Sequence, residues 1–431
     1  LTGFANGFGR TNNNALHFKN SNYYNEANFY SLAAELNSNL GGSLANTFRA
    51  TYTKQNDPRS SDSSPFPFVD ILKDNQPFTS FGYEPFSYGN LRDVEMYSFV
   101  DNFTWIKGSH NFTFGAQADF NTTRNGFQRF ATSYYTFRSW DDFVNGVKPV
   151  DFALTYSLEP GFAQAFPTFK FAQYSAYAQD EFNVNDKLKL TGGLRLEYAT
   201  YPDALKEHPL VSGLDFAGGE KLNTANLPKS ALMFSPRAGF NWDVKGDRSI
   251  QLRGGTGIFT GKVPFVWIVS QAGDAGMLQI TQQFETDRKN INDPSKYETP
   301  GPFNPNPAAY RPETVPAAGT SLPSSITVID ENFKMPQTWK SSFAVDAKLP
   351  LGIIGTLEGI YNRDINTAYF RNPNLVDPTP LNVNGYPDNR MIYPNNVQDR
   401  YYNPATRATK ANNYTSVPVA RGTALAQAFN T

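Results

Sequence analysis

The sequence of 431 residues contains no cysteine, only three histidines and a formal net charge of -1. Without cysteine the chain can form neither disulfide bonds nor thiolate metal sites. A net charge near zero provides no basic field for DNA or RNA, so we expect no nucleic-acid partner. The apolar runs are only several residues long, whereas a membrane-spanning helix needs about 20. These absences exclude disulfide frameworks, nucleic-acid-binding domains and helical membrane proteins.

Recognisable catalytic motifs are absent as well. His17, His110 and His208 have no metal-like partners at a fixed spacing. The sequence holds no HExxH zinc motif, GxSxG nucleophile motif or phosphate-binding loop. We therefore expect no catalytic residue, no metal site and no cofactor, and we expect that the chain is not an enzyme.

Aromatic residues are abundant instead, at 15% of the chain with 36 Phe and 23 Tyr. The mean hydropathy is -0.49, a value that membrane strands can reach because their apolar and polar residues alternate. Such a composition fits the aromatic girdles of an outer-membrane barrel. Aromatic-rich carbohydrate-binding β-proteins share it.

The stretch 172–201 shows the alternation most clearly. After a short polar turn at 185–187, apolar residues fall at every second position from Leu188 to Tyr198, and polar residues fall between them. A period of two indicates a strand, because successive side chains point to opposite faces. The stretch predicts a hairpin of two strands of roughly ten residues, enough to cross the apolar band of a tilted barrel wall.

Short turns and long connections alternate along the whole chain. A compact soluble domain seldom has several loops longer than about 15 residues, whereas a transmembrane barrel has short periplasmic turns and long extracellular loops. The pattern predicts an all-β, antiparallel transmembrane barrel. Further hairpins are predicted at 29–53, 97–121, 234–260 and 339–361, and the long connections at 55–94, 125–171, 202–231, 263–337 and from 364 onward.

Several stretches resemble one family. The barrel signature of TonB-dependent outer-membrane receptors is similar to SAYAQDEFNVNDKLKLTGGLRLEY, and their periplasmic hairpin is similar to KGSHNFTFGAQADF. The narrower Oar-like branch, common in Bacteroidetes, resembles FSPRAGFNWDVKGDRSIQLRGGTGIFTGKVPFVWI and FKMPQTWKSSFAVDAKLPLGIIGTLEGIYNRDINTAYFRNPNL. The matching stretches cover about half of the chain, and their spacing agrees with the predicted hairpins.

The resemblance implies that residues 1–431 are part of one barrel domain in the bacterial outer membrane. They would form a wall segment of about 10–12 strands in a barrel of about 22 strands. The family's plug domain and TonB box are not visible in this sequence. The implied partners are outer-membrane lipid, the plug of the full-length protein, TonB and other outer-membrane proteins.

The resemblance also implies a function, namely TonB-dependent transport of a ligand across the outer membrane. Outer loops would capture the ligand, which would pass through the lumen after TonB pulls on the plug. Two alternatives remain open. One is a passive or structural barrel that serves as a subunit of a larger outer-membrane complex, and the other is a soluble carbohydrate-binding β-protein.

Polar residues opposite the apolar stripes are candidates for the lumen lining. An Arg that faces lipid at the membrane midplane would cost about 2–4 kcal/mol, so these residues are expected to face inward. They would contact the plug or a passing ligand, or else form cross-strand ion pairs that fix register, such as Glu181 with Arg195. The candidates are Gln179, Glu181, Arg195, Glu197, Arg237 and Arg253.

Aromatic residues in the long loops are candidates for ligand binding. They would stack on sugars or peptides, or else hold the loops together. They are Trp267, Tyr310, Tyr369, Tyr386 and Tyr393.

Asp180 contradicts the simple pattern, because it falls on the apolar face several residues from the turn. Three explanations remain open. A β-bulge shifts the phase near Gln179 and Asp180, or this level lies in the lipid headgroup zone, or Asp180 meets another protein.

Overall fold

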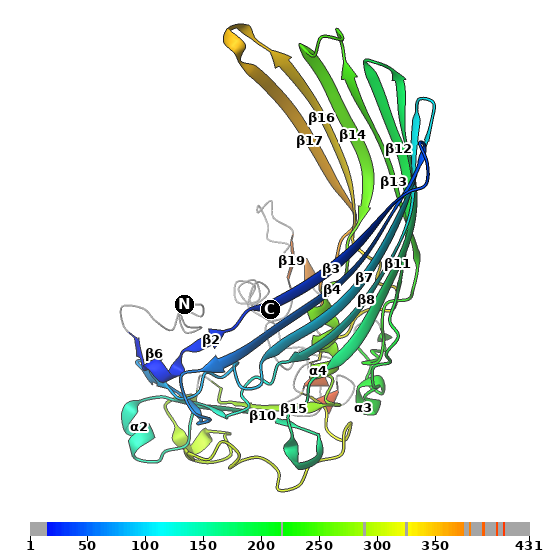
Figure 1. Ribbon diagram of the computed structural model, residues 1–431. Coiled ribbons are helices and arrows are strands. Elements are labelled where there is room, and N and C mark those ends of the chain that lie inside the picture. Colours follow the sequence, from blue (N-terminus) through cyan, green and yellow to red (C-terminus); the bar gives the residue numbers. More distant parts are fainter. Residues whose placement is uncertain are drawn as a thin grey trace.

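The computed structural model describes residues 15–374 except 217–218, 288–289 and 324–325, and also describes 379–380, 390–392, 402–403 and 408–409. Figure 1 shows a large curved sheet with short turns at one end and the long connections packed at the other. This arrangement confirms the predicted all-β fold. Four short strands lie beyond the large sheet in sequence, and they pair as β18 (Thr379–Pro380) with β19 (Met391–Ile392) and β20 (Tyr402–Asn403) with β21 (Ala408–Thr409).

The large sheet, which we call the wall, contains ten long antiparallel strands in the order β3-β4-β7-β8-β11-β12-β13-β14-β16-β17. The short strand β2 precedes β3 and pairs with the same neighbour, β4. Ten strands lie within the predicted range. Their bounds are β2 Tyr23–Asn25, β3 Asn28–Asn39, β4 Leu44–Ser61, β7 Leu91–Lys107, β8 His110–Gly126, β11 Thr168–Asn185, β12 Leu188–Thr200, β13 Leu232–Asp243, β14 Ile250–Thr260, β16 Gln337–Lys348 and β17 Ile354–Asn366.

All five predicted hairpins are confirmed. In the 172–201 hairpin a polar side chain closes the turn. The Asn185 carboxamide oxygen accepts hydrogen bonds from the amides of Lys187 at 2.9 Å and Leu188 at 3.0 Å. The predicted strand length of roughly ten residues was too short, because β4 and β11 each span 18 residues. The outer half of β4 is more polar, and at the loop end of β11 Phe169 and Phe171 lie on the otherwise polar face, so the simple alternation ends before the strand does.

The register places apolar and polar side chains on opposite faces of the wall, because paired residues share a face. On the apolar face, aromatic residues gather at two levels, one beside the turns, as at Trp105 beside Phe112, and one near the middle of the long strands, as at Tyr52 beside Tyr97. Shorter side chains occupy the level between them, as at the paired Ala116 and Ala176. The apolar face therefore has two aromatic levels.

Asp180 lies on the apolar face in unbroken register, opposite Phe112 on one side and Gly192 on the other. The register shift between β11 and β12 occurs at Asn183 and Asn185, beside the turn. The proposed bulge at Gln179 and Asp180 is therefore wrong. Asp180 instead accepts a hydrogen bond from His110 Nδ1 at 2.7 Å, close to the turn end of the wall.

The long connections form a second sheet of six strands, which we call the loop sheet. Five of its strands come from three different connections and β1 from the segment before the wall, and its order is β1-β6-β5-β9-β10-β15. Aromatic residues form its core, with Tyr135, Phe137 and Phe152 almost completely buried. Much of the aromatic content attributed to membrane girdles therefore packs here. The bounds are β1 Leu16–His17, β5 Phe68–Lys73, β6 Gln76–Phe81, β9 Tyr134–Phe137, β10 Asp151–Ser157 and β15 Gln279–Glu285.

The helices are short and lie in the connections. No helix in the described part of the chain is long and apolar enough to cross a membrane. The α-helices are α2 Trp140–Val144, α3 Pro209–Ser212 and α4 Phe265–Asp274, and the 3-10 turns are η1 Lys19–Ser21, η2 Pro160–Phe162, η5 Pro294–Lys296 and η6 Pro350–Gly352.

Candidate functional site

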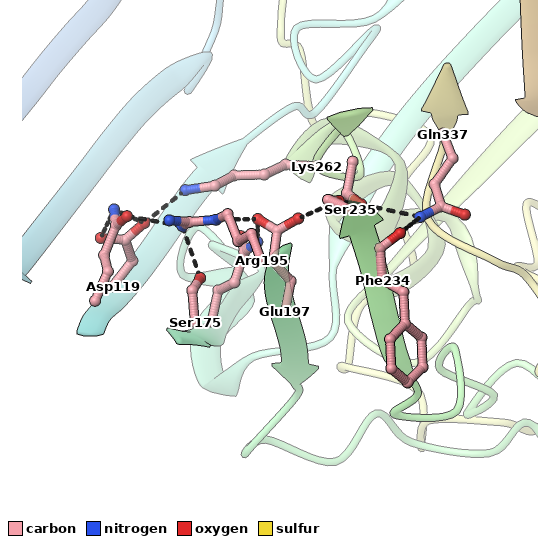
Figure 2. A network of polar contacts seen from close by, with 11 residues as sticks. Asp119, Ser175, Arg195, Glu197, Phe234, Ser235, Lys262 and Gln337 are labelled. Atoms are coloured by element: carbon pink, nitrogen blue, oxygen red, sulfur yellow. Dashed lines mark hydrogen bonds and ion pairs between the residues drawn. The ribbon is translucent and has the colours of Figure 1, made fainter. Parts of the chain in front are cut away.

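A chain of hydrogen bonds crosses the polar face of the wall near its loop end, and we call it the polar belt (Figure 2). It links seven neighbouring strands, from β7 to β16, and one residue from the connection after β14. Every link joins side chains, apart from one bond to the Phe234 carbonyl oxygen. The belt comprises Ser98, Gln117, Asp119, Gln173, Ser175, Arg195, Glu197, Ser235, Thr260, Lys262 and Gln337.

Arg195 is the central donor of the polar belt. Its Nη2 donates to Gln117 Oε1 and to Ser175 Oγ, both at 2.8 Å. Its Nε donates to Glu197 Oε1 at 3.2 Å, and its guanidinium lies 5.1 Å from the ring centre of Tyr177. The register brings these groups together, because Ser175 pairs with both Gln117 and Glu197. Arg195 is therefore held in one orientation by partners on three strands.

Glu197 is buried, with 8% of its surface exposed, and its charge is well compensated. It accepts hydrogen bonds from Arg195, from Gln173 Nε2 at 3.3 Å and from Ser235 Oγ at 3.4 Å. A buried carboxylate without such partners would be costly. The Glu197 carboxylate is thus satisfied by partners that link β11, β12 and β13.

The connection after β14 folds back over the polar face, and we call residues 261–274 the strap. Lys262 Nζ donates to Asp119 Oδ2 at 2.9 Å, although three strands separate β14 from β8 in the wall. Asp119 also accepts from Ser98 Oγ at 2.6 Å, and 8% of its side chain is exposed. The Gly261 amide donates to the Pro336 carbonyl oxygen at 2.8 Å, which joins the start of the strap to the segment entering β16.

The helix of the strap, α4, packs against apolar residues at the loop end of β11. Phe169 and Phe171, which share the polar belt's face with Gln173, contact Phe265 at ring-centre distances of 5.6 and 5.4 Å. Ile268 has no exposed surface. At the end of the helix, burial raises the pKa of Asp274, and the charge of Arg129 opposes this rise only in part. The apolar packing of α4 and the ion pair of Lys262 with Asp119 therefore both hold the strap on the wall.

A cavity of about 1030 Å³ opens on the loop side of the strap. It lies between the connection after β12, the connection before β16 and the segment after β17. Arg371 and Glu220 form a bidentate ion pair in its lining, at 2.7 and 2.5 Å, which raises the pKa of Arg371. The lining contains as many acidic as basic residues among those described, which are Glu220, Asp330, Glu331, Lys221, Lys334 and Arg371.

Two of the predicted ligand-binding aromatics, Trp267 and Tyr369, line this cavity. Tyr310 does not, because its ring packs on Phe152 in the core of the loop sheet and its hydroxyl donates to the Pro302 carbonyl oxygen at 2.6 Å. For Tyr310 the structure thus matches the alternative of holding loops together. Two other candidates, Tyr386 and Tyr393, lie outside the described residues.

All six candidates for the lumen lining lie on the polar face, but only Arg195 and Glu197 belong to the polar belt. The suggested pairing of Glu181 with Arg195 is wrong, because Arg195 lies level with Tyr177, four residues further from the turn. Glu181 accepts instead from Lys189 at 3.1 Å. Of the remaining three, Gln179 lies opposite Gly193. The Arg237 guanidinium lies 4.6 Å from the Phe259 ring centre, and Arg253 pairs with Asp346 at 3.0 Å.

Sequence reasoning missed Asp119 and Lys262. Asp119 had a usable signal, since it continues the polar alternation of Gln117 on the same strand. Lys262 had none, because its contact depends on the strap folding back across three strands.

A family model described as an outer membrane beta barrel domain matches residues 3–424. This chain belongs to that family. The all-β barrel fold and the location in the bacterial outer membrane follow, and they exclude the soluble carbohydrate-binding protein. No curated protein matches the chain at a significant level.

Solved structures of outer-membrane proteins are similar to this barrel domain at low identity. The outer membrane transporter YddB from Escherichia coli is 12% identical with a TM-score of 0.47, over 80% of this chain and 35% of its own. The siderophore receptor PirA from Acinetobacter baumannii is 10% identical with a TM-score of 0.38, over 79% and 34%. The chain thus spans about a third of the length of these two proteins.

Proposed function

We propose that this barrel domain is a wall segment of a TonB-dependent outer-membrane transporter of the Oar-like type, which moves a ligand through its lumen. The observation that carries the proposal is the strap, which covers part of the polar face and separates it from a cavity on the loop side. A passive pore needs no such cover. A transporter that must hold its ligand before passage does.

In this proposal the apolar face meets lipid and the polar face lines the lumen. The two aromatic levels of the apolar face support the assignment, because aromatic side chains favour the membrane interfaces. The ion pairs of Arg195 and Arg253 on the opposite face support it as well. With this assignment, the apolar residues of each strand face lipid and the polar residues between them face the water of the lumen.

The ligand would bind first in the cavity, where the aromatic surfaces of Trp267 and Tyr369 are available. It would then pass along the polar face, which requires the strap to leave the wall. Breaking the contact of Lys262 with Asp119 would be part of that step. The family resemblance supplies the rest, in which TonB acts on a plug domain and the inner-membrane proton gradient provides the energy. No bond of the ligand is broken.

A structural role as a subunit of a larger outer-membrane complex is the second candidate. The satisfied hydrogen bonds of Glu197 favour it, because a network without free donors stabilises a wall as well as it guides a ligand.

Uptake by living cells separates the two candidates. The growth medium of cells with and without the full-length gene would be compared by mass spectrometry, with and without a protonophore. A transporter removes at least one solute from the medium only when both the gene and the proton gradient are present. Identical media from the two strains would contradict transport.

The cavity is tested by Trp267→Ala in the same assay, with Trp140→Ala as the matched control. Trp140 is half exposed and lies on α2 outside the cavity. Slower uptake for Trp267→Ala alone is expected. Equal uptake by both variants would remove the cavity from the ligand's path.

The strap is tested by tethering it, which the absence of cysteine makes simple. Asp119→Cys and Lys262→Cys would be combined in the full-length protein and joined by a bis-maleimide. We expect the tethered protein to assemble and to lose uptake, while each single variant treated in the same way keeps it. Full uptake by the tethered protein would show that the strap need not move.

A further inference from the structure

His110 and Asp180 form an unusual pair for the apolar face of a membrane wall. His110 Nδ1 lies 2.7 Å from Asp180 Oδ2, and the imidazole stacks between Phe112 and Phe182 at ring-centre distances of 5.4 and 4.3 Å. Asp180 thereby fixes the ring and leaves Nε2 for another partner. The imidazole lies nearly parallel to both aromatic rings, at interplanar angles of 2° to Phe112 and 6° to Phe182.

A shallow cavity of about 590 Å³ lies beside this pair at the turn between β7 and β8. Its aromatic walls are Trp105, Phe112 and Phe182, and its polar groups come from the turn and from the residues on either side of it. The lining residues are Trp105, Lys107, Gly108, Ser109, His110, Phe112 and Phe182.

The polar rim of this cavity is suited to an anion. Lys107 Nζ lies 5.1 Å from the Trp105 ring centre, so its charge stays at the rim. Within the part of the chain that the structure describes, the amides of Gly108 and Ser109 donate no hydrogen bond, and Gly108 has a φ of 58°. The Ser109 carbonyl oxygen accepts from the Asn183 amide at 2.8 Å, which holds the turn against β11. The rim thus joins one ammonium, two unused amides and one imidazole nitrogen.

The position of the cavity along the wall favours a lipid over a soluble anion as its occupant. Trp105 and Tyr97, at opposite ends of the apolar stretch of β7, are separated by about 26 Å along the strand, so Trp105 marks one boundary of the membrane. A phosphate at the Lys107 rim would lie at headgroup depth, while its acyl chains would follow the apolar face past Phe114, which is 44% exposed. A soluble anion would gain nothing from that surface.

We propose that this cavity binds one phospholipid of the membrane leaflet on the turn side, through its phosphate. Lys107 and the turn amides contact the phosphate, and the His110 imidazole contacts the headgroup from the aromatic wall. This assigns a role to Asp180, which orients His110. The proposal does not depend on transport, because the site lies on the lipid side of the wall.

Native mass spectrometry of the full-length protein in detergent tests the site, with phosphatidylethanolamine added as the probe. Lys107→Ala and His110→Ala are each expected to weaken retention of one lipid by about tenfold, the value of one charge-assisted contact. Lys245→Ala is the matched control, because Lys245 lies in the turn between β13 and β14 at the same end and does not line the cavity. It should bind like the wild type.

Two results would overturn the proposal. Equal retention by Lys107→Ala, His110→Ala and the control would show that lipid binds elsewhere on the wall. Displacement of the lipid by inorganic phosphate at millimolar concentration would show a site for a small anion only. Heat-modifiable migration on a semi-native gel verifies that each variant is folded. If Lys107→Ala fails that check, Lys107→Arg takes its place in the test. Because Lys107→Arg keeps the charge, it should retain the lipid like the wild type.

Discussion

The wall and the loop sheet are both antiparallel for most of their length, but they solve different problems. Each wall strand presents an apolar face and a polar face, and its neighbours in space are mostly its neighbours in sequence. The loop sheet buries residues such as Tyr135 and Phe152 in an aromatic core, and its strands come from connections far apart in the chain. A sheet between lipid and water must alternate, whereas a sheet packed among loops need not. The two should therefore respond differently to substitution.

The largest effect is expected in the loop sheet. Phe152→Ala removes a ring that packs on Tyr135 at 4.9 Å and has 1% exposure, and such a change costs about 3–5 kcal/mol. Limited proteolysis should then cut the loops, while heat-modifiable migration of the wall is unchanged. The matched control is Phe78→Ala on β6, whose ring is 39% exposed and should matter little. Loss of the wall together with the loops would show that the two sheets unfold as one unit.

A charge on the apolar face should have the next largest effect. Leu194→Arg places a guanidinium between Ala178 and Pro236, at a cost of about 2–4 kcal/mol if this face meets lipid. Thr191→Arg on the polar face of the same strand is the control. Urea unfolding in lipid vesicles measures the difference. Equal destabilisation by both changes would reverse the assignment of the faces.

Two aspartates on the apolar face sharpen this comparison further. Asp101 is exposed at the level between the aromatic girdles, opposite Phe48 and Ala116, and accepts from Asn46 at 2.9 Å. Asp101→Leu should stabilise the protein in lipid vesicles by about 1–2 kcal/mol, because lipid disfavours a carboxyl group at that depth. Asp180→Leu should destabilise it, because His110 loses its partner. Destabilisation by Asp101→Leu would mean that another protein covers this part of the wall.

The smallest effect concerns pH and lies in the strap. Burial raises the pKa of Asp274, so the folded strap binds a proton more readily than the unfolded chain does. This contribution is present below the ordinary aspartate pKa and is lost as the pH rises through the raised value. Protease resistance of the strap should therefore decrease as the pH rises above the ordinary aspartate pKa of about 4. Asp274→Asn should remove that dependence and keep the strap resistant at neutral pH, and an unchanged pH profile would contradict this explanation.

The sequence predicts the wall far better than the loops. Alternation from Leu188 to Tyr198 follows directly from the two solvents, and the short turns locate each hairpin. The loop sheet carries no such period, because a core such as that of Phe152 accepts apolar residues on both faces. The sequences of the loop-sheet strands therefore resemble those of irregular connections.

The candidate site likewise contains residues that the sequence could predict and residues that it could not. Arg195 and Glu197 could be selected because strand alternation places them on the polar face. Lys262 could not be selected, because no local pattern indicates that the strap crosses three strands to reach Asp119. The cavity aromatics Trp267 and Tyr369 could be suggested by residue type, but their proximity depends on loops that meet only in the folded chain.

The two outer strands of the wall impose a parity rule on anything that completes it. Within the described residues β3 pairs only with β4 and β17 only with β16, so each has one unpaired backbone edge. β3 runs from the loop end towards the turns, whereas β17 runs from the turns towards the loop end. An antiparallel complement must therefore begin and end with strands of opposite direction. Whatever protein closes this wall must contribute an even number of strands, and a complement with an odd number would force one parallel seam.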